Sequence, residues 1–337
     1  MNILIGLNTQ ELQEYLKQTG EQEFRGKQIS DWIYKQYIRD FSLMTNLSKD
    51  LRQKLEEQAC ISKNEIIDKY TSSSGTTKYL IGLSDKEKIE CVKITHQKHQ
   101  TLCVSSQAGC PVSCNFCATG LNGFKRNLKC GEIVDQYLLI RSQNPSPVSH
   151  VVFMGMGEPM LNLNEVLKSV NILNKEVGIG IRNITISTIG IIPGIKQLMD
   201  KKLALNLAVS LHAPNQKLRE KLIPFCKNYP YSALLNACKE YAEITKRRIT
   251  FEYTFLQGVN DSPEAARELV KNLRGIHCHI NLIPFNAVDK CNYKPSPIKQ
   301  IKLFCEILSN AGFPATIRKS AGQDIKAACG QLTGRRT

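Results

Sequence analysis

Apolar residues in the N-terminal part of the chain recur at the spacing of amphipathic helices. The first predicted helix begins at Thr9, which we expect to be its N-cap, the second lies around residues 29–37, and the third begins at Ser48. Residues 65–95 instead contain short β-rich runs separated by clusters of turn residues, which predicts a small β-meander. Helices followed by a meander indicate an N-terminal accessory domain, residues 1–95.

From residue 101 onward, β-rich runs alternate with amphipathic helical stretches. Six strands are predicted, at residues 101–107, 150–157, 183–190, 203–211, 248–256 and 279–285. Between the last two, Ser262-Pro263 provides a helix start and Gly275 a helix stop. This alternation predicts a second α/β domain, residues 96–337, with a parallel sheet that is either flat or curled into a barrel. In a barrel, functional residues gather at the carboxyl ends of the strands.

Composition and charge point to a globular protein with a polyanionic partner. The chain has 337 residues, 42% of them hydrophobic, which excludes disorder, and a formal net charge of +15. Residues 101–337 carry 30 of the 45 Lys and Arg residues but only 16 of the 30 acidic ones. This asymmetry favours nucleic acid slightly over a basic surface kept for solubility. Because the chain lacks a membrane-length apolar run and a signal-peptide pattern, we expect a cytoplasmic protein that does not associate with membranes.

The spacing of three cysteines indicates a metal centre. In a reducing compartment, the 13 cysteines of this chain suggest metal or catalytic chemistry before disulfides. Cys110, Cys114 and Cys117 form a C-x3-C-x2-C pattern directly after the first predicted strand of the second domain. An iron–sulfur cluster held by only three cysteines would leave one iron open to a further ligand. A structural zinc site completed by a distant cysteine is the alternative.

These motifs resemble a known family. The cysteine triplet, with Phe116 before its last member, is similar to the signature of radical S-adenosylmethionine (SAM) enzymes. The segments TLCVSSQAGC, CNFCATG, FKRNL, FMGMGEPMLN, ISTIGIIPGI, AVSLHAPN, INLIPFN and DIKAACGQL, in that order, resemble the RlmN family, which methylates carbon 2 of adenine in 23S ribosomal RNA and in tRNA. This resemblance covers residues 100–332 and implies a partial six-stranded (βα)6 barrel with a small accessory domain and a short C-terminal extension.

The resemblance implies two cofactors. Cys110, Cys114 and Cys117 match the ligands of one [4Fe-4S] cluster, whose open iron binds SAM and whose electron cleaves it to a 5′-deoxyadenosyl radical. The positions that match SAM contacts follow the ends of four strands: Gly157, Glu158, Ser187, Ser210, Leu211, His212 and Asn286. Taken singly, each of these residues is unremarkable. Together they place polar groups at one rim of the predicted sheet.

Three further residues match catalytic positions of the family. Cys329 is expected to receive a methyl group from one SAM, and a second SAM supplies the radical that activates it. Cys103 is expected to deprotonate the RNA adduct and to form a transient disulfide with Cys329. Glu90 matches a proton acceptor, although the sequence equally allows a solvated carboxylate. A thiol relay suits this substrate because carbon 2 of adenine is electron-poor, whereas a thiolate is strongly nucleophilic.

The expected partners follow from the same resemblance. They are 23S rRNA at the peptidyl transferase centre, tRNA at the adenine next to the anticodon, and an external electron donor such as flavodoxin; we expect a monomer. Candidate RNA contacts are Lys125, Arg126, Lys217, Arg219, Lys221, Arg318 and Lys319. Two alternatives stay open: the related Cfr enzymes, which methylate carbon 8, and a non-catalytic RNA-binding protein with structural zinc. The proline in GMGEPMLN and the tail motif favour the carbon-2 branch.

Overall fold

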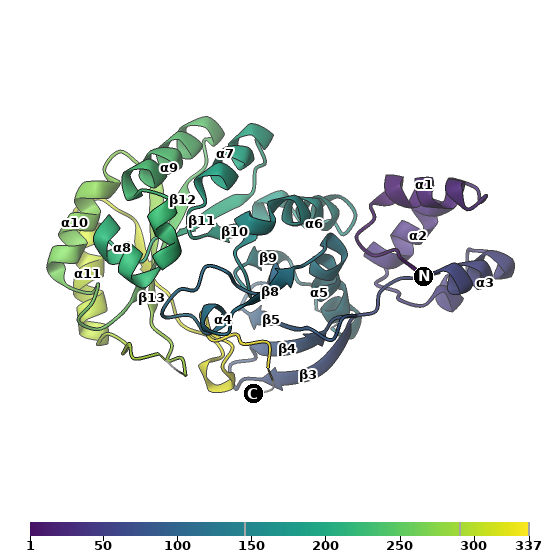
Figure 1. Cartoon of the computed structure of the whole chain (residues 1–337), viewed down its shortest axis with the longest axis horizontal. Helices are drawn as coiled ribbons and strands as arrows, with labels where there is room; N and C mark the ends of the chain where they lie inside the picture. Colours follow the sequence, from purple (N-terminus) through teal and green to yellow (C-terminus); the bar gives the residue numbers. More distant parts are fainter. Residues whose placement is uncertain (145, 290, 336–337) are drawn as a thin grey trace.

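The N-terminal helices form a lobe of their own. The computed structural model describes residues 1–144, 146–289 and 291–335. Figure 1 shows α1 (Thr9–Gln18), α2 (Arg25–Tyr34) and α3 (Lys49–Gln58) in purple at one end of the molecule, beyond α5 and α6. Ser48 caps α3 as predicted, but the predicted cap of α1 is wrong by one residue. Asn8 is the N-cap, because its side chain accepts the Glu11 amide while the Glu11 carboxylate accepts the Asn8 amide.

One large sheet forms the body of the protein. Within the described residues it has ten strands, in the order β14-β13-β12-β11-β10-β9-β6-β5-β4-β3. The parallel part consists of β6 (Gln100–Cys103), β9 (His150–Phe153), β10 (Ile184–Thr188), β11 (Asn206–Ser210), β12 (Ile249–Phe255), β13 (Cys278–Pro284) and β14 (Ala315–Ile317). The six predicted strands are therefore confirmed, although most are shorter than predicted. The pattern gave no sign of β14, which has only three residues.

The predicted meander extends this same sheet. Its strands are β3 (Glu65–Thr71), β4 (Thr77–Gly82) and β5 (Lys88–Thr95), all antiparallel. Strand β5 also pairs with β6, with Val92 opposite Cys103. The proposed boundary between residues 95 and 96 thus lies inside a continuous sheet. Two small sheets contain the other strands of the described residues: β1 (Asn2–Ile3) with β2 (Ala59–Cys60), and β7 (Gln107–Gly109) with β8 (Phe124–Asn127).

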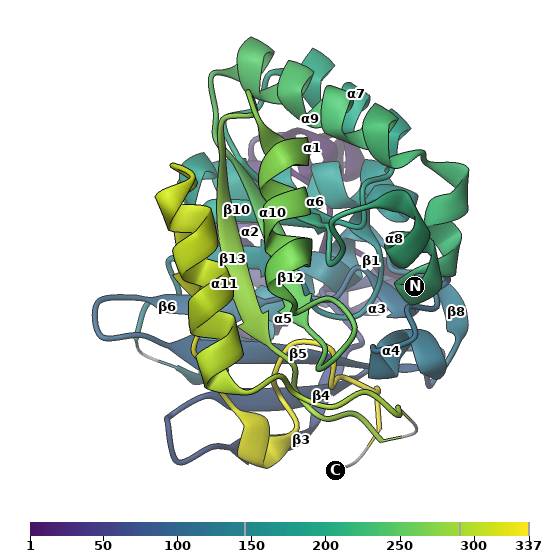
Figure 2. The same cartoon turned by 90° about the vertical axis from the view of Figure 1, so that its left-hand side faces the viewer.

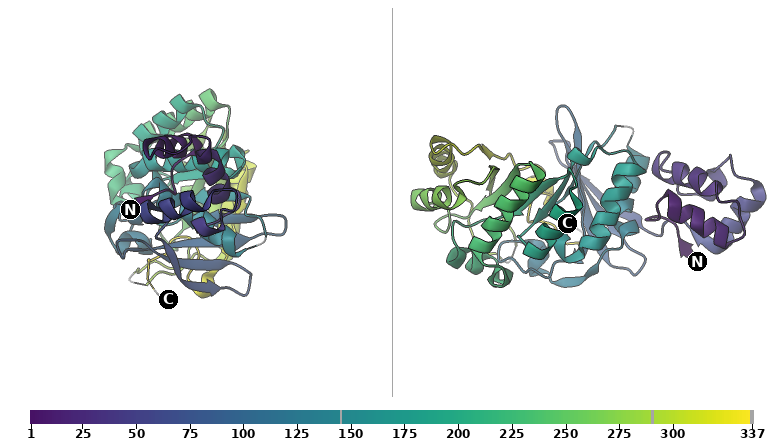
Figure 3. Two further views of the ribbon diagram at one scale, coloured as in Figure 1. Left: turned by 90° about the vertical axis from the view of Figure 1, so that its right-hand side faces the viewer. Right: turned by 90° about the horizontal axis from the view of Figure 1, so that it is seen from above.

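Helices cover the outer side of the curved sheet. The longer ones are α5 (Cys130–Gln143), α6 (Leu163–Lys175), α7 (Ile192–Lys201), α9 (Tyr231–Thr245), α10 (Pro263–Leu273) and α11 (Ile298–Asn310). Two short helices, α4 (Ala118–Leu121) and α8 (Gln216–Leu222), follow the cysteine loop and β11 instead. Figures 2 and 3 show α9, α10 and α11 along this outer side. None of the helices in the described parts of the chain has the length and apolar character needed to cross a membrane. Ser262 and Pro263 begin α10 as predicted.

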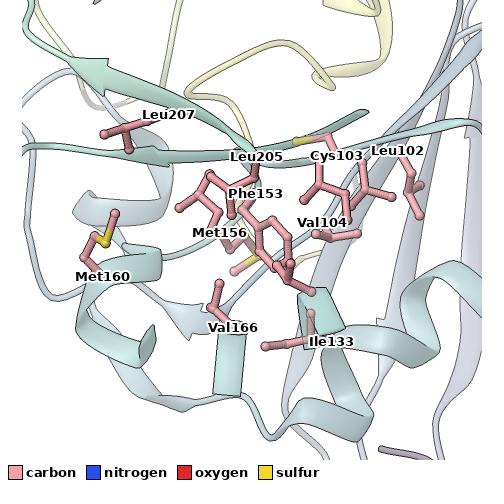
Figure 4. Close-up of a cluster of buried hydrophobic side chains, with 14 of the residues drawn as sticks. Leu102, Cys103, Val104, Ile133, Phe153, Met156, Met160, Val166, Leu205 and Leu207 are labelled. Atoms are coloured by element: carbon pink, nitrogen blue, oxygen red, sulfur yellow. The ribbon is translucent and has the colours of Figure 1, made fainter. Parts of the chain in front are cut away.

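The hydrophobic core fills the space between sheet and helices. Figure 4 shows part of it, with Val104 close to Phe153 of β9 and to Ile133 of α5; Leu102 of β6 lies at the edge of this view, and the sulfur of Cys103 points away from the group. Leu102 and Ile133 are fully buried, and Phe153 is 1% exposed. This packing fixes β6 and β9 side by side, so the loops that follow these two strands begin at defined positions.

A buried carboxylate joins the N-terminal lobe to the barrel. Asp135 in α5 is fully buried and accepts hydrogen bonds from Arg39, Ser62 and Asn64. Arg39 also donates to the Asn64 carbonyl, with Nη2 and oxygen 2.6 Å apart. Arg39 lies between α2 and α3, and Ser62 and Asn64 lie between α3 and β3, so Asp135 holds two segments of this part of the chain against the barrel.

We predict that Asp135→Ala lowers the free energy of unfolding by about 3 kcal/mol, because it leaves Arg39 and Asn64 without their buried acceptor. The matched control is Asp31→Ala, which removes an exposed carboxylate paired with Lys27 and Lys35 within one helix. That change should cost less than about 1 kcal/mol. Urea titration followed by circular dichroism measures both. Equal losses in the two variants would contradict the assigned role of Asp135.

Candidate active site

A cavity at the carboxyl ends of the parallel strands brings most of the predicted site residues together. Its lining includes Cys110, Cys114, Cys117, Gly157, Glu158, Ser187, Ser210, His212, Asn286 and Cys329. A second cavity shares Cys117, Asn286, Arg318 and Cys329 with the first and adds Cys103. Two adjoining cavities therefore lie at the carboxyl ends of the strands, where the sequence predicted the functional residues. Among the residues predicted for catalysis, SAM binding and the cluster, Leu211 and Glu90 lie outside both linings.

The three cysteines of the triplet lie in the loop between β7 and α4. Burial raises the pKa of the Cys110 thiol to about 12, and burial together with the neighbouring thiols raises that of Cys114. A bound cationic metal would reverse this preference, because it stabilises thiolates. Three sulfur donors in one cavity suit iron–sulfur or zinc chemistry. Within the described residues, however, no three such side chains already stand at metal-ligand spacing.

The turn after β9 places a carboxylate in the cavity wall. Gly157 has a φ of +105°, and a Cβ at this position would lie 2.6 Å from the Gln107 Cβ, so the turn requires glycine. The Glu158 carboxylate is 3% exposed and accepts the amides of Met160 and Ile189 at 3.0 and 2.8 Å. Burial raises the pKa of Glu158 to about 7, although these hydrogen bonds oppose the shift. Such a carboxylate gains strongly from a bound cationic group.

His212 contributes a neutral imidazole. Its Nδ1 accepts the Thr254 amide at 3.1 Å, which assigns the proton to Nε2. Burial, together with the charge of Arg219, lowers the pKa of His212 to about 3, so the ring remains uncharged. The Phe116 ring meets it edge-on, with centroids 5.1 Å apart. The imidazole is therefore held rigidly between β12 and the cysteine loop, with Nε2 able to donate.

The predicted RNA contact at Arg219 is wrong. This side chain is fully buried, and its guanidinium donates to the carbonyls of Ile189, Ser210 and Leu211. It turns inward from α8 and ties together the loops after β10 and β11, so it cannot reach a phosphate at the surface. Leu211 is also fully buried, which leaves its backbone as the part that can contact a ligand.

The two remaining predicted cysteines meet at the second cavity. Cys103 ends β6 and is 8% exposed, whereas Cys329 lies in the C-terminal segment and is accessible from the cavity. The Cys329 carbonyl accepts from Asn286 Nδ2 at 3.2 Å. Burial raises the pKa of Cys103 to about 12 and also raises that of Cys329, while the charge of Arg318 opposes both shifts. Both are free thiols here, at the same cavity as Cys117.

Sequence reasoning missed one acidic residue of the site. Glu252 on β12 lines the first cavity, is 4% exposed, and accepts from Asn281 Nδ2 at 3.0 Å. Its carboxylate lies 3.7 Å from the guanidinium of Arg318, which the sequence suggested only as an RNA contact. The available signal was an acidic residue in the otherwise apolar or uncharged run ITFEYTF, at an alternating position that faces the barrel interior.

The other candidate polar residues have different surroundings. Glu90 is fully buried beside Lys78, so the alternative of a solvated carboxylate is wrong. Arg126 is paired with Asp85 and Glu132. The predicted basic residues at exposed positions are Lys125, Lys217, Lys221 and Lys319, and Lys319 also lines the second cavity.

Known proteins match this chain over nearly its whole length. Residues 1–61 match the family model of the ribosomal RNA large subunit methyltransferase N-terminal domain, and residues 104–270 match that of the radical SAM superfamily. A "probable dual-specificity RNA methyltransferase RlmN" of Trichodesmium erythraeum is 47% identical, over 99% of this chain and 96% of the relative. One from Caldanaerobacter subterraneus is 46% identical, over 97% of this chain and 96% of the relative.

A solved structure also matches this chain over nearly its whole length. The crystal structure of a radical SAM methyltransferase from Sphaerobacter thermophilus has a TM-score of 0.96 with this chain at 40% sequence identity, and covers 99% of this chain and 100% of that one. The superfamily to which these proteins belong uses SAM and a [4Fe-4S] cluster, which agrees with the cysteine triplet in the cavity. Sequence, fold and site agree, and the chain belongs to the RlmN family of radical SAM enzymes.

Proposed function

We propose that this chain methylates carbon 2 of adenine in RNA, both in 23S rRNA at the peptidyl transferase centre and in tRNA at the adenine next to the anticodon. The observation that carries the proposal is the second cavity, which Cys103, Cys329 and Cys117 line together. A thiol relay needs two thiols within reach of each other and of the cofactor. The RlmN relatives support the choice of RNA and of carbon 2 over carbon 8.

Cys110, Cys114 and Cys117 would hold one [4Fe-4S] cluster per chain. When bound, this cluster supplies the electron that cleaves SAM to a 5′-deoxyadenosyl radical. The walls around it suit SAM: Gly157 allows close backbone approach, and buried Glu158 can accept from the ammonium group. The other proposed contacts are the side chains of Ser187, Ser210, His212 and Asn286 and the backbone of Leu211.

In the proposed relay, the Cys329 thiolate takes a methyl group from one SAM, and two SAM molecules are consumed for each methyl delivered. Burial raises the pKa of both Cys329 and Cys103, and the charge of Arg318 opposes this shift and so favours the thiolate. The 5′-deoxyadenosyl radical takes a hydrogen atom from this methyl group, and the remaining carbon radical adds to carbon 2. The adduct gives up one electron, which the oxidised cluster would accept, and Cys103 removes the proton from carbon 2. Cys103 then bonds to the sulfur of Cys329 as the carbon–sulfur bond breaks, the released carbon takes up a proton to complete the methyl group, and reduction of the disulfide restores both thiols.

The proposal includes further partners. Exposed Lys125, Lys217 and Lys221 offer positive charge to the RNA backbone, and the excess of basic residues in residues 101–337 supports an RNA substrate. An external electron donor such as flavodoxin would reduce the cluster. We propose that the chain acts as a monomer in the cytoplasm, where its RNA substrates are found.

We expect the reconstituted enzyme to form 2-methyladenosine in both 23S rRNA and tRNA that have not been modified before. Mass spectrometry of nucleosides, with 2-methyl and 8-methyl standards, measures the product. An 8-methyl product without the 2-methyl product would instead identify a Cfr-type activity.

Loss of either relay thiol should have a distinct effect. Cys329→Ala should lower methyl transfer from labelled SAM to RNA by on the order of a thousandfold or more, because the methyl acceptor is missing. Cys103→Ala should instead trap a covalent protein–RNA adduct, visible on a denaturing gel. Cys305→Ala, which changes a partly exposed thiol on α11, is the matched control and should behave as the unchanged enzyme. Normal methylation by Cys329→Ala would rule out the relay.

The metal content separates an iron–sulfur enzyme from a zinc protein. Anaerobically purified protein should contain about four iron atoms with sulfide per chain and be brown. Cys114→Ala should lose this iron. The matched control is Cys226→Ala: a structural zinc held by the triplet would need a fourth ligand, and Cys226 is a buried thiol whose charge contributes to the pKa shift of Cys114. Iron retained in Cys226→Ala supports the cluster, whereas one zinc that is lost in this variant would overturn it.

A further inference from the structure

The segment that carries Cys329 has little regular structure. We define residues 318–335 as the C-terminal tail; apart from a short 3-10 turn at Gln323–Ile325, it is irregular. The tail is drawn in yellow in Figure 1, where it lies against β4, β5 and α4. Helix α4 bonds to it twice: the Ala118 amide donates to the Gly330 carbonyl at 2.7 Å, and the Thr119 hydroxyl donates to the Leu332 carbonyl at 2.8 Å. An irregular segment depends on such contacts for its position.

A buried ion pair in the extended sheet contacts the tail on both sides of Cys329. Lys78 on β4 is 2% exposed, Glu90 on β5 is fully buried, and Nζ and Oε1 lie 3.0 Å apart. Lys78 Nζ also donates to the Lys326 carbonyl at 3.3 Å. Glu90 Oε2 accepts the amides of Thr333 and Gly334 at 2.6 and 2.9 Å. The pair thus fixes the tail three residues before Cys329 and again four and five residues after it.

The physical chemistry of burial makes these contacts strong. A buried ion pair is stable only when its remaining donors and acceptors are also satisfied, and the tail supplies three of these partners. If the tail left the sheet, the carboxylate would lose two charge-assisted hydrogen bonds. The fit is close, since Gly334 has a φ of +71° and a Cβ there would lie 2.8 Å from the Lys88 carbonyl oxygen. Only glycine permits this approach without displacement.

Glu90 is poorly placed to touch the reacting atoms. Among the described residues it lies outside the lining of both cavities, and both of its oxygens are occupied by Lys78 and by tail amides. We propose that Glu90 and Lys78 are positioning residues, which together clamp the tail and so present the Cys329 thiol to the cofactor and to Cys103. This inference rests on the proposed methyl relay through Cys329. It replaces the role of Glu90 as a proton acceptor.

The clamp also defines what can move. With Lys326 held on one side and Thr333 and Gly334 on the other, residues 327–332 form a short loop with fixed ends. Cys329 must meet SAM in one step, carbon 2 of adenine in the next and Cys103 in the last. A short loop with fixed ends allows small rotations of this thiol while it excludes large excursions.

The test compares three variants of the full-length, cluster-loaded enzyme. Glu90→Gln removes the charge from the sheet side, and Gly334→Ala disturbs the same contact from the tail side without altering the buried pair. The matched control is Gly275→Ala, because Gly275 has a similar φ of +78° but nothing within 4 Å of an added Cβ. Two quantities are measured without RNA: hydrogen exchange of tail peptides, and the rate at which Cys329 gains a methyl group, followed by peptide mass.

We expect Glu90→Gln and Gly334→Ala to exchange their tail amides about tenfold faster and to methylate Cys329 about tenfold more slowly, with normal iron content. Gly275→Ala should match the unchanged enzyme in both. A proton acceptor acts only on the RNA adduct and gives another result: Glu90→Gln would show normal tail exchange and normal Cys329 methylation, and would fail only when RNA is added. That result would overturn the clamp.

The outcomes separate this inference from the proposed function. If the unchanged enzyme never gains a methyl group on Cys329, the relay is wrong, but hydrogen exchange still tests the clamp. If Glu90→Gln does not fold, Gly334→Ala decides alone. Faster tail exchange and slower Cys329 methylation in Gly334→Ala would support the clamp. Values equal to those of Gly275→Ala would exclude it.

Discussion

The active site depends on the hydrogen-bonded register of strand β6. On one side β6 pairs antiparallel with β5, with Val92 opposite Cys103; on the other it pairs parallel with β9, with Cys103 opposite Val152. The barrel that surrounds the cofactor cavity and the meander that supports the C-terminal tail are therefore one hydrogen-bonded sheet. A slip of one residue in this register would turn Cys103 to the other face of the sheet. The position of Cys103 thus depends on this strand directly, and that of the tail with Cys329 depends on it through β5, whose Glu90 contacts the tail.

The second constraint is the cost of buried charge. Glu90, Glu158, Glu252 and Arg219 are nearly or fully buried, and each is stabilised differently: by an ion pair, by backbone amides, by a neighbouring Asn and Arg, and by backbone carbonyls. Burying a charged group costs free energy, which hydrogen bonds and ion pairs must offset. In this protein the same hydrogen bonds and ion pairs fix the positions of turns and loops that form no regular structure. The loops after β10 and β11, joined by Arg219, are the clearest case.

Local patterns in the sequence were sufficient to predict part of this architecture. The alternation of strands and helices is a local signal, so the six parallel strands were predicted correctly, and the cysteine triplet indicated a metal-binding loop. Contacts between distant segments leave no local signal. The pairing of β5 with β6, the inward turn of Arg219 and the return of the tail to β4 and β5 all depend on residues far apart in the chain. Resemblance to a family supplied the functional pairing of Cys103 and Cys329, which periodicity could not.

The tail also completes the barrel. The sheet is open, with β3 and β14 at its edges, so the strands alone do not enclose the second cavity. One wall of this cavity comes from Val92, Ile94 and Cys103 of β5 and β6, and the opposite wall includes the tail residues around Cys329. The segment that closes the cavity is thus the same segment that carries Cys329, the proposed methyl acceptor. Enclosure of this cavity and the presentation of the Cys329 thiol to it are therefore set by one structural element.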